Sequence, residues 1–241
     1  MTDEPREPQT EAPGEAELPS TQINRLSERQ RHDREALHDV LDSALFAHVA
    51  VVRDGVPVVL PLLHARDGDR LLLHGSTGGG LLREAAAGAP VTVAVTVVDG
   101  LVVADSLFES SANYRSAVVF GRCSVVPPEG RLAALRALSD RLLPGRWLEV
   151  RPPTAKELAA TLVLEMPLEH ASVKVRTGPP SPFDASADPP PDGVPLWWGV
   201  VPLAVTPAAP VTAPDVPVGT PLPPSVLALL DLPDHREASG T

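Results

Sequence analysis

Short β-rich runs joined by tight turns are the feature that most constrains the fold of this chain. Residues 46–52 and 56–63 are largely apolar and β-branched, and Arg53-Asp54-Gly55 separates them. An Asp-Gly pair between two such runs predicts a hairpin, because the turn needs positive φ angles that glycine adopts without strain. Asp67-Gly68-Asp69 repeats this signal before the next run at 70–74. The pattern therefore predicts an antiparallel meander of three strands.

The same patterning continues further along the chain. Additional strands are predicted at 91–98, 101–104, 114–126, 162–166 and 171–176. Asp99-Gly100 predicts a hairpin between the first two of these runs. Most connections between these strands are too short for the crossover that a parallel pair requires. The sequence therefore predicts a mainly β fold, an antiparallel split β-barrel with peripheral helices.

Helical spacing of apolar residues accounts for the segments between the strands. Apolar residues between 37 and 45 recur at intervals of three and four, which predicts a helix. Asp33 is a suitable N-cap for this helix. A second helix is predicted at 129–143, before Pro144-Gly145. Thr154 with Glu157 three residues later is a capping-box pattern, which predicts a short helix there.

Composition divides the chain into one folded domain and two flanks. Residues 1–27 are polar and acidic without apolar periodicity, which predicts a disordered N-terminal tail. Sixteen of the 29 prolines lie after residue 178, and each removes a hydrogen-bond donor, so 179–241 is predicted to be a Pro-rich tail. The domain then covers 28–178. The apolar island 195–203, with its double tryptophan, is predicted to dock onto the barrel.

Charge and cysteine content exclude several classes of protein. The net charge of −11 argues against non-specific nucleic-acid binding. No apolar run is long enough to span a membrane, and the N-terminus lacks a secretory pattern, so a cytoplasmic location is expected. The single cysteine, Cys123, excludes an internal disulfide and is predicted to be a buried thiol. The histidines show no metal-ligand spacing, and no metal site is predicted.

Two polar strings interrupt the apolar strands. Leu73-His74-Gly75-Ser76 lies where a strand runs into a loop, and Asn113-Tyr114-Arg115-Ser116 opens the longest strand. Arg115 can pair with a phosphate, and Tyr114 can stack or donate a hydrogen bond. The alternative is a loop-to-strand junction whose arginine pairs with an acidic side chain.

In this layout the chain resembles the flavin-binding split barrels of the pyridoxamine 5′-phosphate oxidase family. The nearest subgroup resembles flavin-nucleotide-binding proteins that include nitroimidazole-resistance-type reductases, and the resemblance covers about residues 25–203. It implies FMN as cofactor, a small-molecule substrate, and a homodimer with cofactor sites at the interface. The residues that it places at the cofactor are Val59, Leu60, Pro61, Leu62, His74, Gly75, Ser76, Arg83, Tyr114, Arg115, Ser116 and Trp197.

The chain departs from this family at the expected phosphate site. Family members usually carry Ser-Arg or Ser-Lys where this chain has Gly79-Gly80. The loop at 78–80 can still offer backbone N–H groups at a helix start, or it can be only a flexible loop. Arg83, one turn later, is a possible substitute.

Three functions therefore stay open at this stage. The first is an FMN-dependent oxidoreductase, in which His74 or Tyr114 could handle a proton but no residue is identified as catalytic. The second is a non-catalytic module that binds flavin, deazaflavin or haem. The third is an interaction protein without a cofactor. His74 can equally be a strand-end histidine that backbone groups satisfy.

Overall fold

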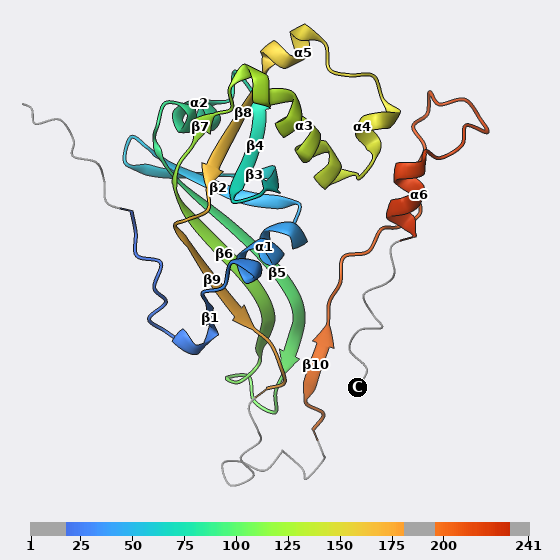
Figure 1. Ribbon diagram of the computed structural model, residues 1–241. Helices are drawn as coiled ribbons and strands as arrows, with labels where there is room; N and C mark the ends of the chain where they lie inside the picture. The colour runs from blue at the N-terminus through green and yellow to red at the C-terminus, as the bar shows by residue number, and fades with distance from the viewer. Residues whose placement is uncertain (1–17, 181–195, 232–241) are drawn as a thin grey trace, which may run out of the picture.

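A computed structural model of the chain describes residues 18–180 and 196–231 (Figure 1). The first 17 residues of the predicted N-terminal tail, residues 181–195 and residues 232–241 lie outside the described residues. The described part of that tail lies against the domain. His170 Nε2 is 2.7 Å from the carbonyl of Pro19, and Lys174 Nζ donates to the carbonyl of Arg25 at 2.9 Å.

The described strands form one antiparallel sheet in the order β1-β9-β6-β5-β2-β3-β4-β8-β7, with β10 paired to β5. Their bounds are β1 Gln30–Arg31, β2 Phe46–Arg53, β3 Val56–Asp67, β4 Arg70–Ser76, β5 Pro90–Val103, β6 Ser111–Arg122, β7 Ser124–Val125, β8 Thr161–Pro167, β9 Ala171–Arg176 and β10 Gly199–Pro202.

Most of the helices lie in the connections between strands. They are η1 Ser27–Arg29, α1 Arg34–Ser43, α2 Gly80–Ala86, α3 Pro128–Leu142, α4 Arg146–Glu149, α5 Ala155–Ala160 and α6 Pro224–Leu230. The helices predicted near 37–45, 129–143 and Thr154 are present as α1, α3 and α5. Asp33 caps α1 by accepting from the Ala36 amide at 2.8 Å, and Thr154 with Glu157 forms the predicted capping box of α5. None of the described helices is long and apolar enough to cross a membrane.

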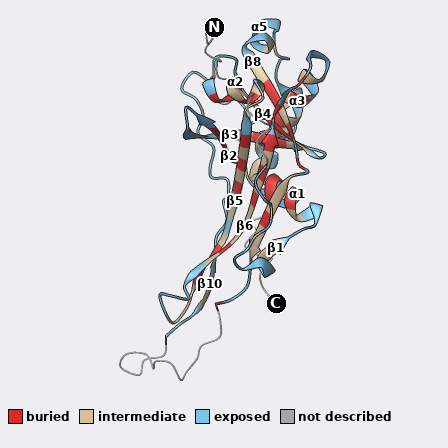
Figure 2. Ribbon diagram, turned by 90° about the vertical axis from the view of Figure 1, so that its left-hand side faces the viewer, coloured by how far each residue is buried: buried red, intermediate tan, exposed pale blue. Residues whose placement is uncertain are grey.

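The sheet closes through β6 and β7, which are almost continuous in the chain. Only Cys123 separates β6 from β7, and β7 pairs with β8 at the opposite end of the strand order. Buried side chains from β2, β4, β5 and β6 fill the space between this curled sheet and α1, while the far end of the β5–β6 hairpin is largely exposed (Figure 2). Cys123 is buried, as predicted, and burial raises the pKa of its thiol to about 11.

The tight turns agree with the sequence at two of three places. Asp54 and Gly55 have φ angles of 51° and 76°, and Gly68 has 59°. The hairpin predicted at Asp99-Gly100 is wrong, because β5 continues through both residues with a register shift between Val98 and Gly100. A Cβ added at Gly100 would lie 2.9 Å from the carbonyl oxygen of Val201, so the glycine permits β10 to approach rather than the chain to turn. Within the described residues, 199–202 pair with this end of β5 as β10.

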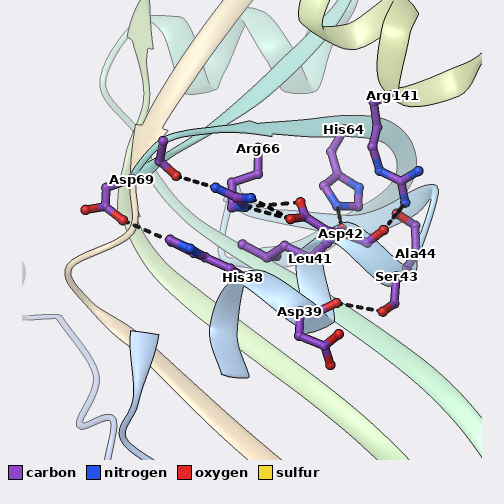
Figure 3. A network of polar contacts seen from close by, with 11 residues as sticks. His38, Asp39, Leu41, Asp42, Ser43, Ala44, His64, Arg66, Asp69 and Arg141 are labelled. Atoms are coloured by element: carbon purple, nitrogen blue, oxygen red, sulfur yellow. Dashed lines mark hydrogen bonds and ion pairs between the residues drawn. The ribbon is translucent and has the colours of Figure 1, made fainter. Parts of the chain in front are cut away.

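A polar network joins α1, β3 and α3 on one side of the barrel (Figure 3). The buried His64 contacts the carbonyl of Leu41 through Nε2 at 3.0 Å. Arg141 of α3 donates to the carbonyl of Asp42 at 2.6 Å, and Arg66 pairs with the carboxylate of Asp42 at 2.5 Å. The network satisfies carbonyls at the end of α1, which have no partner inside the helix.

Candidate functional site

The residues expected at the flavin ring lie on a part of β3 that has one free edge. Residues 56–63 pair with β2, but only 64–67 pair with β4. Val59 and Leu60 are 53% and 44% exposed. Pro61 has no amide hydrogen, and an unpaired edge is where a strand tolerates proline. The edge therefore presents apolar side chains and backbone groups to a ligand.

The strand period separates these residues into two faces. Val59 and Pro61 share a face with Ala50 and His48, their partners on β2, whereas Leu60 and Leu62 point to the opposite face. All four can contact one planar group only along the free edge of the strand. The geometry therefore favours a ring that lies against the edge rather than flat on one face of the sheet.

The polar end of β4 lies next to α2. His74 pairs with Val163 of β8 and is half-buried, and its Nδ1 has no hydrogen-bond partner among the described residues. Burial lowers the pKa of His74, so its imidazole is neutral at pH 7. A Cβ added at Gly75 would lie 2.5 Å from the Leu82 side chain, so this glycine allows α2 to pack closely on β4. This Nδ1 is buried as well as unpaired, so it reaches no ligand at the surface in this conformation.

The glycine loop uses most of its own amides. The N–H of Gly78 donates to Ser76 Oγ at 3.2 Å, and the N–H of Gly79 donates to the Ser76 carbonyl at 2.9 Å. Thr77 donates to the carbonyl of Ala160 at 3.0 Å. These bonds make an ordered turn. An anion at this turn would find few free backbone donors, and it would need cationic side chains.

One such cation comes from a residue that the sequence analysis did not select. Arg53, at the end of β2, donates from Nε to Glu84 Oε1 of α2 at 2.6 Å. A Cβ added at Gly80 would lie 3.0 Å from Arg53 Nη2. The guanidinium therefore lies over the start of α2, beside the position that the expected phosphate-binding side chains would occupy. Arg83 on α2 is exposed and makes no ion pair with the residues described.

Arg115 lies in a different environment. Its guanidinium donates to Asp99 at 2.9 and 3.0 Å, to Asp39 Oδ2 at 2.6 Å and to Ser43 Oγ at 2.8 Å. The hydrogen bonds to Asp99, together with those to Asp39, raise the pKa of Arg115 further above its ordinary value. This is the ion-paired arrangement that the sequence left open as an alternative. A phosphate at Arg115 would have to displace two carboxylates.

The remaining predicted residues lie far from β3 within one subunit. Tyr114 and Ser116 are on β6, and β5 and β2 lie between β6 and β3, so three strand spacings, roughly 14 Å, separate them. Trp197 precedes β10 and is 65% exposed. β10 pairs with the far end of β5, nine residues from Ala94, or roughly 30 Å along the strand. One subunit therefore does not bring all the predicted residues together.

Comparison with known proteins identifies the family. The family model described as pyridoxamine 5′-phosphate oxidase matches residues 33–175, which include β2 to β8 and most of β9. The chain belongs to the pyridoxamine 5′-phosphate oxidase family. A putative 5-nitroimidazole antibiotic resistance protein from Bacteroides thetaiotaomicron shares the fold, with a TM-score of 0.52 at 18% identity over 61% of this chain and 86% of that chain. A comparison with curated proteins finds no match.

Two solved structures resemble this family member over most of its length. The FAD and heme binding protein from Mycobacterium smegmatis is 48% identical, with a TM-score of 0.77 over 83% of this chain and 97% of that chain. The flavocytochrome Anf3 from Azotobacter vinelandii is 34% identical, with a TM-score of 0.77 over 86% of this chain and 95% of that chain. Both alignments extend beyond the barrel that the family model covers.

Membership of the oxidase family confirms the split barrel and changes how the glycine loop is interpreted. Sequence reasoning identified Gly79-Gly80 as a departure but looked for a substitute only at Arg83 on the same helix. Arg53 gave no sequence signal, because it lies at a hairpin turn 26 residues earlier. Only the pairing of β2 with β3 and the packing of α2 bring it beside Gly80.

Proposed function

We propose that this chain is a flavin-binding oxidoreductase that holds its cofactor along the free edge of β3 and acts on a small molecule. The observation that carries the proposal is the exposed apolar edge at Val59–Leu62 beside the polar end of β4, in a chain that is 48% identical to an FAD and heme binding protein. A flavin needs these features, an apolar slot for its ring and cations for its phosphate.

The residues present fit a flavin. The edge of β3 would cover the ring, His74 at the end of β4 would lie near its polar rim, and Arg53 and Arg83 beside the start of α2 would hold phosphate. A bound flavin supplies hydride or electron transfer, and the protein orients it and excludes water. Burial lowers the pKa of His74, which favours the neutral imidazole and makes it a weaker base.

FAD is now preferred over the FMN that the resemblance implies. The support is that two relatives that align over more than four-fifths of this chain are an FAD and heme binding protein and a flavocytochrome. FAD and FMN share the ring, the ribityl chain and the first phosphate, so the site on β3 and α2 serves either one.

Haem is a second candidate ligand, and the same two relatives favour it. A histidine imidazole is one of the side chains that hold haem iron in proteins. His48 is exposed, has no hydrogen bond to the described residues, and lies between Pro61 and Ala94 on neighbouring strands. His48 would be the ligand to iron, and His48→Ala would remove haem absorbance without unfolding the chain.

A homodimer would complete the site. One face of the sheet carries a row of paired residues, Pro61, His48, Ala94, Val118 and Ser172, that are half-buried or exposed. The core and α1 lie on the other face. A second copy against the open face would bring Tyr114, Ser116 and Trp197 of one subunit toward β3 of the other. This supports the interface site that the resemblance implies.

The test is the visible spectrum of the purified protein before and after incubation with FAD or FMN and desalting. Retained flavin absorbance and a higher melting temperature would support the proposal, because a ligand present at 100 times its Kd stabilises the native state by about 2.7 kcal/mol. A haem band in the untreated protein would support the second ligand. A colourless protein whose melting temperature ignores both flavins would contradict the proposal.

A further inference from the structure

The start of α2 brings together a guanidinium and a glycine that belong to different parts of the chain. A Cβ at Gly80 would lie 3.0 Å from Nη2 and 3.8 Å from Cζ of Arg53. The backbone φ of Gly80 is not in the left-handed region, so the turn itself does not require glycine there. A side chain at position 80 would instead compete with Arg53 for the same space.

Glu84 holds the Arg53 guanidinium by one edge only. The contact uses Arg53 Nε and Glu84 Oε1, at 2.6 Å. The N–H groups on Nη1 and Nη2 have no acceptor among the described residues. Such a guanidinium is oriented by its carboxylate and still presents two nitrogens in the fork geometry that matches phosphate oxygens.

Other donors at this place are already engaged or more distant. Two of the loop amides, those of Gly78 and Gly79, donate to Ser76, as shown above. Arg115 pairs with two carboxylates on another part of the sheet. Arg53 lies against the start of α2 and Arg83 lies on it, so these two arginines are the candidates to neutralise a phosphate there.

We propose that Arg53 is the main phosphate-binding residue for the flavin, and that it replaces from the end of β2 the cation that the glycine loop lacks. The inference rests on the proposed flavin-binding function. Gly80 leaves space for the guanidinium, Glu84 orients it, and Arg83 lies one turn further along α2 as a second, weaker contact. The ligand group recognised is the phosphate next to the ribityl chain, which FMN and FAD share.

The experiment compares riboflavin with FMN, which differ by that phosphate, in titrations followed by flavin fluorescence. Wild-type protein should bind FMN more tightly than riboflavin. Arg53→Gln should weaken FMN binding by roughly ten- to hundredfold, as expected for losing hydrogen bonds to a charged group, and should leave riboflavin affinity unchanged. Arg136→Gln is the matched control, because Arg136 is a surface arginine paired with Asp140 on α3.

Two further variants separate charge from folding. Arg53→Lys keeps the charge without the fork and should keep part of the preference for FMN. Glu84→Gln removes the negative charge but keeps an oxygen that can accept from Arg53 Nε, so the preference for FMN should be kept. Circular dichroism and melting curves of each variant show that it is folded before its affinities are compared.

The outcomes distinguish this inference from the proposed function. If wild-type protein binds riboflavin and FMN, and folded Arg53→Gln keeps the wild-type ratio of the two affinities, the Arg53 assignment is overturned and flavin binding stands. Equal wild-type affinity for riboflavin and FMN would also overturn the Arg53 assignment and leave flavin binding in place. If wild-type protein binds neither FMN, FAD nor riboflavin, both proposals are overturned.

Discussion

Arg115 is a residue whose surroundings give it a structural role that can be measured. Its guanidinium joins α1 to β5 and β6 through Asp39 and Asp99. Arg115→Met keeps much of the apolar stem but leaves half-buried Asp99 without its cation. We expect the free energy of unfolding in urea to fall by about 1–3 kcal/mol, the range for hydrogen bonds to charged groups.

The same variant tests the cofactor role that the sequence predicts for Arg115. A structural arginine predicts unchanged FMN affinity in the folded variant, whereas a phosphate contact across a dimer interface predicts a fall for FMN and none for riboflavin. Arg115→Met combined with Asp99→Asn should be less destabilised than the sum of the single variants, because the two residues interact directly.

The buried His64 makes the free energy of unfolding depend on pH. Its Nε2 carries the proton, because the Leu41 carbonyl can only accept, and its buried Nδ1 has no described partner. Burial, followed by the positive charge of Arg141, lowers the pKa of His64 below its ordinary value of about 6.5. The unfolded chain therefore binds the proton more readily than the folded one. Stability is complete above the unfolded pKa and is lost as pH falls below it.

The measurement is the melting temperature of wild type and His64→Gln from pH 8 to pH 5. Wild type should lose stability across the lower part of this range, and His64→Gln, though less stable at pH 8, should show a flatter profile. His74 contributes in the same direction, because burial lowers its pKa as well. The exposed His32 provides the control, and a His32→Gln profile as flat as that of His64→Gln would contradict the assignment.

At the scale of elements, β10 depends on one glycine of β5. Gly100 lies against the carbonyl of Val201 and the side chain of Val200. Gly100→Val should detach β10, because the new side chain has no space while that pairing persists. Hydrogen exchange should then show faster exchange of the β10 amides and of Leu203, which donates to Asp99 at 3.0 Å.

The control for this experiment lies on the same strand. Thr96→Val also places valine on β5, but at an exposed position beyond the reach of β10. It should leave protection at 199–203 unchanged. Unaltered exchange in Gly100→Val would mean that β10 tolerates a shifted register, and the explanation given for Gly100 would be wrong.

At the scale of the whole molecule, the open sheet face predicts self-association. Val98 lies on this face at 48% exposure, and Leu132 lies on α3 at 49% exposure. Val98→Arg places a charge in the proposed interface, where desolvation is costly, while Leu132→Arg is matched in exposure but lies elsewhere. Light scattering should give twice the chain mass for wild type and Leu132→Arg, and one chain mass for Val98→Arg.

The flavin affinity of the same variants provides a second measurement. If the cofactor site needs both subunits, Val98→Arg should lose flavin affinity along with dimerisation. A monomeric wild-type protein that retains flavin would remove the dimer from the proposal and leave the edge of β3 as a site within one subunit.

Structural features that depend on a few neighbouring residues could be predicted from the sequence. Asp33 caps α1, Thr154 and Glu157 form a capping box, and Asp54 and Gly55 adopt the positive φ angles of a hairpin turn. Each is determined by backbone hydrogen bonds within about four residues, so the local sequence contains all the partners. The antiparallel barrel followed from the short connections, which exclude parallel pairing.

Features that depend on distant partners were decided by the tertiary structure. Asp99-Gly100 has the sequence of a turn, but Gly100 lies within β5. It leaves space for β10, about a hundred residues later in the chain. Arg115 was among the residues predicted to contact the cofactor, yet Asp39 of helix α1 is one of its two acidic partners. Nothing in the sequence marked Arg53 as a cofactor-binding residue. The pairing of β2 with β3 and the packing of α2 place it over Gly80. The sequence by itself determined the elements and the barrel, because turn, cap and strand patterns are local. The charge partners of Arg53 and Arg115 were decided only when the sheet closed and brought distant side chains into contact.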